Sequence, residues 1–361
     1  MKKIDFLLFF TVLLLSVFGL IMVYSSSCVW AEYKFQDSFH YLKYQGIFLF
    51  IGLLVLFLFS KISYSFYYKY SNLILFCCFI LLVLVLIPGI GSVRNGSRSW
   101  FGIGSFGIQP SEAAKIGIII FTSKYLSHSQ SFLKNYRKGI FPILGMIFLF
   151  FGLIMLQPDL GTGLILFVSA VAILYVAGCD FKFFLVGGLF GILGIIGLII
   201  IAPYRMQRIT SFLNPWSDPL GTGFQMIQSL YAIGPGGLLG LGYLHSVQKH
   251  FYLPEPQTDF IFSVIAEEFG VIGAIFVVSL FGILLYRGIM ISNRCDDSFG
   301  KYLSFGLVFQ IVVQAIMNLM VVVGLIPVTG VTLPFLSYGG SSLLVSMASI
   351  GIILNVSRNN S

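Results

Sequence analysis

The sequence has 361 residues, of which 58% are hydrophobic and only 9% are charged, and its mean hydropathy is +0.97. A soluble domain carries roughly 25% charged residues, so this composition excludes a water-soluble globular protein and indicates a chain embedded in lipid. The net charge of +8 comes from scattered Lys and Arg residues, which argues against a nucleic-acid-binding surface.

Apolar segments of spanning length recur along the whole chain and predict an all-α, polytopic membrane protein. Because about 20 residues cross the hydrocarbon core, the pattern predicts about ten transmembrane helices in a single domain, residues 1–361. The first is expected to be a retained helix, because no obvious small-residue cleavage site follows it. The expected spans are residues 4–25, 43–60, 71–88, 111–127, 139–157, 160–178, 181–203, 260–286, 301–325 and 336–356.

The distribution of positive charge predicts the orientation. Of the 21 Lys and Arg residues, 13 fall on the side of the N-terminus, 7 fall on the opposite side, and Lys115 lies within a span. Cytoplasmic loops carry the excess of such residues, so both termini are expected in the cytoplasm. The long stretch 204–259 is then extracytoplasmic, and its apolar residues indicate folded or interfacial structure instead of a flexible tail.

The first polar cluster lies at the outer end of the fourth expected span. Pro110 suits the first turn of a helix, which places Glu112 and Lys115 as i,i+3 neighbours on one face. Such a pair could join helices structurally, or it could line a cavity for a phosphate-bearing substrate. The residues by themselves favour neither interpretation.

Further polar residues share the predicted outer side. Asp159 lies in a tight turn and is expected to cap the sixth span. Arg and Lys side chains could bind phosphate there, or they could reach the lipid headgroups as snorkelling residues. These cations are Arg98, Arg205, Arg208 and Lys249.

Asp259 lies where the chain enters the eighth expected span, after two prolines at positions 254 and 256. A carboxylate between water and a low-dielectric cleft can have a raised pKa, which suits a general base. The alternative is that Asp259 caps the helix. Glu267 and Glu268 follow within the apolar run. We expect them to be hydrogen-bonded to neighbouring helices, with a direct catalytic role as the less favoured interpretation.

The last two spans are broken by small polar residues, in Pro327–Gly330 and Ser337–Ser342. Such residues let helices approach closely and tolerate irregular backbone beside a cavity, and packing is the default interpretation.

Taken in order, these motifs resemble those of the SEDS family (shape, elongation, division and sporulation), and within it the FtsW/SpoVE branch. Two positions depart from the usual pattern: Ser99 precedes Trp100 where many relatives have Arg, and Leu244 stands where Gly is usual. The matching segments are Asn95–Trp100, Gln109–Lys115, Gln157–Thr162, Pro203–Ile209, Asn214–Gly223, Gln228–Gly237, Ser246–Phe262 and Leu325–Ser342.

The resemblance implies a ten-helix peptidoglycan glycosyltransferase of the bacterial cytoplasmic membrane, which polymerises lipid II on the outer face for a division septum or spore cortex. It implies Asp259 as the essential aspartate and a class B penicillin-binding protein as partner. We expect Arg and Lys side chains, or a divalent cation (Mg²⁺ or Mn²⁺), to stabilise the leaving pyrophosphate, and no organic cofactor. The candidate substrate-binding residues are Glu112, Lys115, Arg98, Arg205, Arg208, Lys249, Glu255 and Ser341.

Two other functions remain open at this stage. A lipid II flippase or other transporter would place its essential polar groups near the bilayer midplane, and Glu267 and Glu268 are the feature that favours it. A non-catalytic scaffold for a penicillin-binding protein would function without Asp259. The clustering of polar motifs at the outer rim favours the enzyme, an inverting glycosyltransferase with Asp259 as general base.

Overall fold

The computed structural model describes residues 4–359 except 95, 104–105, 129–138 and 202. The described part is mainly helical, with a small antiparallel sheet of order β1-β2-β3. The elements are α1 (Phe6–Phe35), α2 (His40–Lys61), α3 (Tyr64–Leu86), β1 (Ser92–Arg94), β2 (Ser97–Ile103), β3 (Phe106–Ile108), α4 (Pro110–His128), α5 (Ile140–Met155), α6 (Leu160–Val176), α7 (Phe181–Ile201), α8 (Pro203–Leu213), η2 (Pro215–Ser217), α9 (Phe224–Ile233), η3 (Gly234–Gly236), α10 (Ile261–Arg294), α11 (Ser298–Val322) and α12 (Gly340–Asn359).

Three of the helices begin at an Asp whose carboxylate caps the first turn. Asp5, Asp159 and Asp297 accept hydrogen bonds from the backbone N–H three residues later, at 2.9, 3.1 and 3.0 Å. Each satisfies a donor that has no partner within its own helix. The prediction that Asp159 caps a helix is confirmed.

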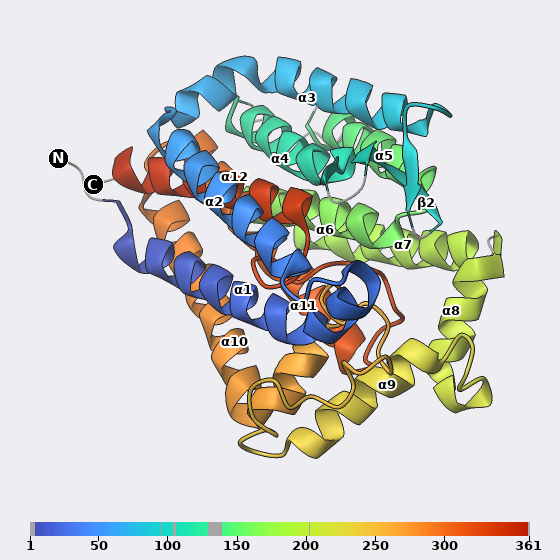
Figure 1. The fold of residues 1–361 in the computed structure, drawn as a ribbon. Helices are drawn as coiled ribbons and strands as arrows, with labels where there is room; N and C mark the ends of the chain where they lie inside the picture. The colour runs from blue at the N-terminus through green and yellow to red at the C-terminus, as the bar shows by residue number, and fades with distance from the viewer. Residues whose placement is uncertain (1–3, 95, 104–105, 129–138, 202, 360–361) are drawn as a thin grey trace.

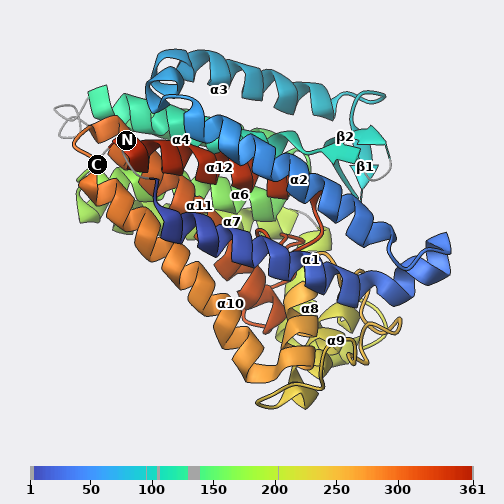
Figure 2. The same cartoon turned by 60° about the vertical axis from the view of Figure 1, so that its left-hand side comes forward.

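The long helices run side by side in a bundle whose two ends differ (Figures 1 and 2). The start of α1 and the end of α12 share one end, where the Asp5 backbone N–H donates to Ser357 Oγ at 3.4 Å. The sheet, α8 and α9 lie toward the other end (Figure 2). Within the bundle α2 packs along α12, α10 along α11 and α1, and α11 along α4 and α6. The polar motifs are carried at the end that bears the sheet.

Each expected span overlaps one helix of the described part, which confirms the all-α prediction. Among the described residues, six helices are long and apolar enough to cross a membrane, namely α1, α2, α3, α10, α11 and α12, while α5 and α6 are shorter apolar helices. The number of about ten spans therefore stays a prediction. Several boundaries differ from the expected ones: α1 continues to Phe35 and α10 to Arg294, α3 begins at Tyr64, where Ser63 caps it, and α12 begins only at Gly340.

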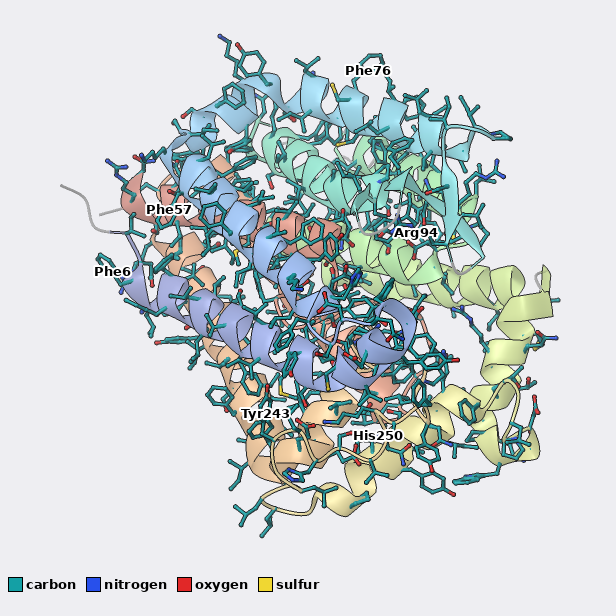
Figure 3. All side chains as sticks on the ribbon, in the orientation of Figure 1. Phe6, Phe57, Phe76, Arg94, Tyr243 and His250 are labelled. Carbon is teal, nitrogen blue, oxygen red and sulfur yellow. The ribbon has the colours of Figure 1, made fainter. Side chains whose placement is uncertain are left out.

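The outer surface of the bundle is apolar, as a lipid-facing surface must be. Phe6, Phe57 and Phe76 point outward from α1, α2 and α3 with 60%, 48% and 58% of their surface exposed (Figure 3). In water such rings would carry a free-energy cost, whereas acyl chains solvate them. This surface supports the inference from composition that the chain is embedded in lipid.

Residues 204–259 are folded, as their apolar content predicts. They form α8, η2, α9 and η3 and then continue as an irregular segment that packs on the start of α10. Tyr243 and His250 lie in that segment near the lower end of the molecule in Figure 3. The Tyr243 hydroxyl donates to the carbonyl of Ile21 in α1 at 3.4 Å, which ties the segment to the bundle.

Helix α10 is broken once, at Gly270, whose φ of 62° and ψ of −157° are not helical. The break frees backbone groups that would be costly to leave unpaired at membrane depth. Residues 237–242 supply the missing partners: Val271 and Ile272 donate to carbonyls of that segment at 3.0 and 3.2 Å, and the carbonyls of Glu267 and Glu268 accept from it at 2.9 and 3.0 Å. The first two turns of α10 are thus a separate unit held by the loop.

Candidate active site

The motifs singled out in the sequence converge at the end of the bundle opposite the termini. Gln109, just before α4, forms hydrogen bonds with residues at the starts of two other helices. Its backbone N–H donates to Ser341 Oγ of α12 at 3.0 Å, and its Nε2 donates to Asp159 Oδ2 at the start of α6 at 2.9 Å. The Tyr338 N–H donates to the carbonyl of Gln257 at 2.8 Å, which joins the segment before α12 to the segment before α10.

Asp259 ends the loop and lies immediately before α10. Its Oδ1 accepts a hydrogen bond from Thr258 Oγ1 at 2.9 Å, and its backbone carbonyl accepts one from Asn318 Nδ2 at 2.6 Å. The N-cap of α10 is Phe260 and no side chain caps the helix. The alternative that Asp259 caps the helix is therefore wrong, and its carboxylate is left for another role.

The surroundings of Asp259 favour the protonated carboxyl more than water does. Partial burial raises the pKa of Asp259, and the nearby negative charge of Glu255 raises it further. The hydrogen bond from Thr258 and the positive charge of Arg208 act in the opposite direction. Glu255 is exposed and takes a φ of 46°, the left-handed region that L-residues rarely adopt. A carboxyl with a raised pKa is suited to accept a proton near neutral pH.

Glu112 and Lys115 form a buried ion pair on the first turns of α4. Lys115 Nζ lies 2.9 Å from Glu112 Oε1, and the two side chains are 1% and 7% exposed. The ammonium also donates to Gln314 Oε1 of α11 at 2.6 Å. The Gln314 amide in turn donates to the Thr332 carbonyl at 3.1 Å and to Ser342 Oγ at 3.2 Å. The pair therefore joins α4, α11 and the start of α12, and its substrate role stays a prediction.

Gln314 and Asn318 were missed by the sequence reasoning. They are four residues apart in α11, so they share one face. Gln314 reaches the Glu112–Lys115 pair, while Asn318 Nδ2 donates to the carbonyls of Asp259 and Val331, at 2.6 and 2.8 Å. The signal that could have found them is two amides at i,i+4 inside an otherwise apolar span, since polar groups in a span need partners.

The predicted cations occupy different surroundings. Arg98 is partly buried on β2, where it pairs with Val93 of β1. The side chain of Arg205 lies outside the residues that the structure describes. Arg208 of α8 is exposed, and its Nη1 donates to the Val328 carbonyl at 3.0 Å. The positive charge of Arg208 acts on Asp259.

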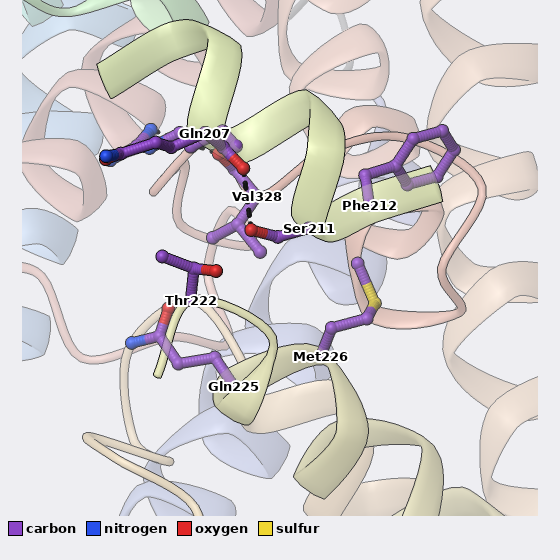
Figure 4. Close-up of a pocket in the computed structure, with 8 residues that line it drawn as sticks. Gln207, Ser211, Phe212, Thr222, Gln225, Met226 and Val328 are labelled. Carbon is purple, nitrogen blue, oxygen red and sulfur yellow. Dashed lines mark hydrogen bonds between the residues drawn. The ribbon is translucent and has the colours of Figure 1, made fainter. Parts of the chain in front are cut away.

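Arg208 also borders a cavity between α8, α9 and the segment after α11 (Figure 4). The cavity volume is about 290 Å³. Its wall combines neutral amides and hydroxyls with apolar side chains and the single guanidinium, a composition that suits a sugar ring more than a bare phosphate. The lining residues are Gln207, Arg208, Ser211, Phe212, Thr222, Gln225, Met226 and Val328.

Lys249, Glu267 and Glu268 do not line this cavity. Lys249 is 3% exposed, and its Nζ lies 3.1 Å from Glu268 Oε1. Glu267 accepts hydrogen bonds from the loop, at 2.5 Å from Ser246 Oγ and 2.8 Å from the Val247 N–H. The expectation of hydrogen bonds to neighbouring helices is confirmed for Glu268, which accepts from Ser25 of α1, but the donors to Glu267 in the described residues come from the loop. The substrate role predicted for Lys249 stays a prediction.

Among the described residues, no three His, Cys, Asp or Glu side chains gather as a ready-made metal site. Mg²⁺ is commonly held by one or two carboxylates and completes its coordination with substrate phosphates. Asp259 and Glu255, whose charges interact, are compatible with that arrangement. The divalent cation stays a prediction.

Comparisons with known proteins agree along the whole chain. A sequence model of the FtsW/RodA/SpoVE family, described as cell cycle protein, matches residues 5–361. Stage V sporulation protein E of Bacillus subtilis (strain 168) is 52% identical over 354 residues, 98% of this chain and 97% of that protein. The probable peptidoglycan glycosyltransferase FtsW of Geobacter sp. (strain M18) is 40% identical over 353 residues, 98% and 96% of the two chains.

Two solved structures share the fold. A chain of a peptidoglycan synthase complex, described as coordinating polymerization and crosslinking, superposes with a TM-score of 0.82 at 30% identity, covering 100% of this chain and 99% of that one. The rod shape determining protein RodA of Thermus thermophilus gives a TM-score of 0.74 at 28% identity, covering 99% and 98%.

Proposed function

Because the chain belongs to the FtsW/RodA/SpoVE family, we propose that it is a peptidoglycan glycosyltransferase that polymerises lipid II at the outer face of the cytoplasmic membrane. The observation that carries the proposal is the carboxylate of Asp259, which does not cap α10 and whose pKa is raised by burial. It lies at the same end of the bundle as the cavity beside Arg208. The family, the site and the lipid-facing surface all support an enzyme that works on a membrane-bound substrate.

The reaction we propose joins two lipid-linked sugars with inversion at the donor carbon. The sugar 4-hydroxyl of one lipid II attacks the anomeric carbon of the growing glycan, a new C–O bond forms, and the bond to the polyprenyl pyrophosphate breaks. Asp259 accepts the proton of the attacking hydroxyl, a role that typically contributes about 10²–10⁴-fold. The leaving group departs with the bonding electrons and is stabilised by positive charge.

Arg208 is the candidate we favour for contact with the leaving pyrophosphate. It is exposed at the cavity, whereas Lys115 and Lys249 are both buried in ion pairs. Guanidinium groups bind phosphate oxygens through two parallel hydrogen bonds. A divalent cation held by Asp259 and Glu255 would add charge stabilisation to the same group. The amides of the cavity wall then suit a sugar of the substrate.

A class B penicillin-binding protein is the partner we propose, because the similar synthase complex combines polymerization with crosslinking. The product of this enzyme, an uncrosslinked glycan strand, is the substrate that a transpeptidase needs. A lipid II transporter is the less favoured function. Glu267 and Glu268, the residues that favoured it, accept hydrogen bonds from the loop, including one from Lys249.

The test is polymerisation of labelled lipid II by the purified full chain, together with a class B penicillin-binding protein of the same organism. The variant is Asp259→Asn, and the matched control is Asp37→Asn, an outer carboxylate in an exposed ion pair with Lys43. We expect polymer from wild type and control and none from folded Asp259→Asn. Equal polymer from all three proteins would remove Asp259 as the base, and absence of polymer from wild type beside an active control enzyme would overturn the proposed function.

A further inference from the structure

A buried charged cluster lies two turns beyond Asp259 and is not used by the reaction as described. It consists of Glu267 and Glu268 of α10, Lys249 and Ser246 of the preceding loop, and Ser25 of α1, and we call it the glutamate bracket. Each of these residues is at most 3% exposed. A charge in such surroundings persists only when it is paired and hydrogen-bonded, so the bracket must be fully formed in the folded protein.

Both carboxylates of the bracket are satisfied by donors from different parts of the chain. Glu267 accepts from Ser246 Oγ at 2.5 Å and from the backbone N–H of Val247 at 2.8 Å. Glu268 accepts from Ser25 Oγ, 2.6 and 2.7 Å from its two oxygens, and from Lys249 Nζ at 3.1 Å. The bracket therefore fastens the loop to α10 and fastens both to α1.

The glutamate bracket lies at one end of the loop formed by residues 246–259, and Asp259 lies at the other end. Gln248, beside the bracket, accepts a hydrogen bond at its carbonyl from the Leu253 N–H at 2.9 Å, and Leu253 is buried. The Glu255 carbonyl accepts from Thr258 Oγ1 at 2.8 Å, and the same hydroxyl donates to Asp259 Oδ1 at 2.9 Å. Residues 246–259 thus run from the bracket to Asp259 with several hydrogen bonds across their turns.

The glutamate bracket is also joined to Asp259 through α10. Residues 261–268 form two helical turns that connect Asp259 to Glu267 and Glu268. The break at Gly270 separates these two turns from the rest of α10. Segment 237–242 is bonded to the unit at its far end. Asp259 therefore lies at the end of a closed body, and the bracket is one of the places where that body is joined to α1.

We propose that Glu267, Glu268 and Lys249 are positioning residues, which set the place of the Asp259 carboxylate for glycosyl transfer. The inference rests on the proposed function. A general base works only within hydrogen-bond reach of its proton, and a displacement of about 1 Å can cost on the order of 10²-fold in rate. The carboxylates of the bracket act through the loop and do not touch the substrate.

The test variant is Glu267→Gln, which keeps the size of the side chain and removes its charge. We expect a folded protein whose kcat falls at least about 10-fold while KM for lipid II stays within about 2-fold. A fall in kcat without a matching rise in KM is the result expected of a misplaced base. Should Glu267→Gln not fold, Ser25→Ala removes one donor to Glu268, and we expect a smaller fall in kcat, again with KM within about 2-fold.

The matched control is Asp5→Asn. Asp5 pairs with Arg287, so this ion pair also joins α1 to α10, but at the opposite end of the bundle. We expect the control to lower the thermal midpoint and to leave kcat and KM at their wild-type values.

Three results separate the possibilities. A wild-type kcat in Glu267→Gln, with Asp259→Asn inactive, would overturn the positioning role and leave the proposed function standing. The same loss of kcat at an unchanged KM in Asp5→Asn would also overturn it, because general loosening of α1 against α10 would then suffice. Full polymerisation by Asp259→Asn would instead overturn the role of Asp259 on which the inference rests.

Discussion

Hydrogen bonds and nearby charges together set the environment of the Asp259 carboxylate. Thr258 donates to its side chain, Asn318 donates to its backbone carbonyl, and the charges of Glu255 and Arg208 act on it in opposite directions. Desolvation is the largest of the effects that raise its pKa. The balance between burial and two opposite charges makes the ionisation of Asp259 sensitive to its neighbours.

Arg208→Gln is expected to move the acidic limb of polymerisation to higher pH. The Arg208 charge favours the ionised form of Asp259, so its removal raises the pKa of that carboxyl further. The active form of the base is the ionised one, and its fraction at a given acidic pH then falls. The measurement is kcat against pH for wild type, Arg208→Gln and Lys43→Gln. Lys43 is an exposed cation paired with Asp37, and its removal should leave the limb in place. An unmoved limb in Arg208→Gln would contradict the assignment of that limb to Asp259.

Leu244 adopts a backbone conformation that is strained for an L-residue. It has a φ of 67°, in the left-handed region that costs an L-residue roughly 1–2 kcal/mol and glycine very little. Glycine would therefore be the least strained residue at this position, and the loop keeps a glycine-type conformation with Leu.

Leu244→Gly is accordingly expected to be about 1 kcal/mol more stable than Leu244→Ala. Both variants lose the same side-chain contacts, and only the alanine keeps the strained Cβ. The comparison is made by thermal unfolding of the two purified proteins in the same detergent. A glycine variant no more stable than the alanine variant would show that the left-handed conformation is not retained in the folded protein.

At the scale of helices, polar side chains join elements that apolar packing alone would leave free to slide. The ion pair of Glu112 and Lys115 on α4 reaches Gln314 on α11, and Gln314 reaches Thr332 and Ser342 before and within α12. In lipid the apolar faces of helices gain little from association, so hydrogen bonds and close packing fix their register. The same chain of contacts passes within one turn of Asn318, which holds Asp259.

Variants of the ion pair distinguish the structural and the functional interpretations of Glu112 and Lys115. Lys115→Met leaves a buried carboxylate unpaired and is expected to cost about 3–5 kcal/mol of stability. The double variant Glu112→Leu with Lys115→Met removes both charges and should recover most of that loss. If the pair serves the substrate, both variants lack polymerase activity, as measured with labelled lipid II. Recovery of activity together with stability in the double variant would show that the pair is structural.

At the scale of the whole molecule, the two ends of the bundle differ in chemistry. One end carries the start of α1, the end of α12 and the Asp5–Arg287 pair. The other end carries the sheet, α8, α9, Asp259 and the cavity beside Arg208. A lipid-linked substrate needs its polar head at one water interface and its tail in the bilayer, and the end of the bundle that carries Asp259 combines polar groups with a lipid-facing surface in this way.

Orientation in the membrane is tested by labelling single cysteines in intact cells with an impermeant maleimide, in a chain whose native cysteines are replaced by Ser. Leu220→Cys, at the end that carries α8 and α9, is expected to react, because Leu220 is 89% exposed. Asp296→Cys, exposed between α10 and α11 at the opposite end, should react only after the membrane is opened. Reaction of Asp296→Cys alone in intact cells would place the termini outside.

The sequence by itself determined that the chain lies in lipid and that its fold is helical. It also determined that the polar motifs gather at one end of the helices. Low charge and long apolar segments leave few other fold classes, because only helices and closed barrels satisfy all backbone hydrogen bonds within a bilayer. Local signals were also sufficient for the Asp159 cap and for the folded state of residues 204–259. The order of the motifs identified the family.

Only the tertiary structure decided which polar groups are partners. Lys249 pairs with Glu268, and Gln314 and Asn318 connect α4, α11 and the Asp259 loop, although the residues in each set lie far apart in sequence. It also decided that Phe260 and not Asp259 occupies the N-cap, and that Gly270 breaks α10. These features depend on which side chains and backbone groups meet across helices. A hydrogen bond or an ion pair fixes a buried group only when the fold brings its partner within about 3 Å, and no local pattern records that distance.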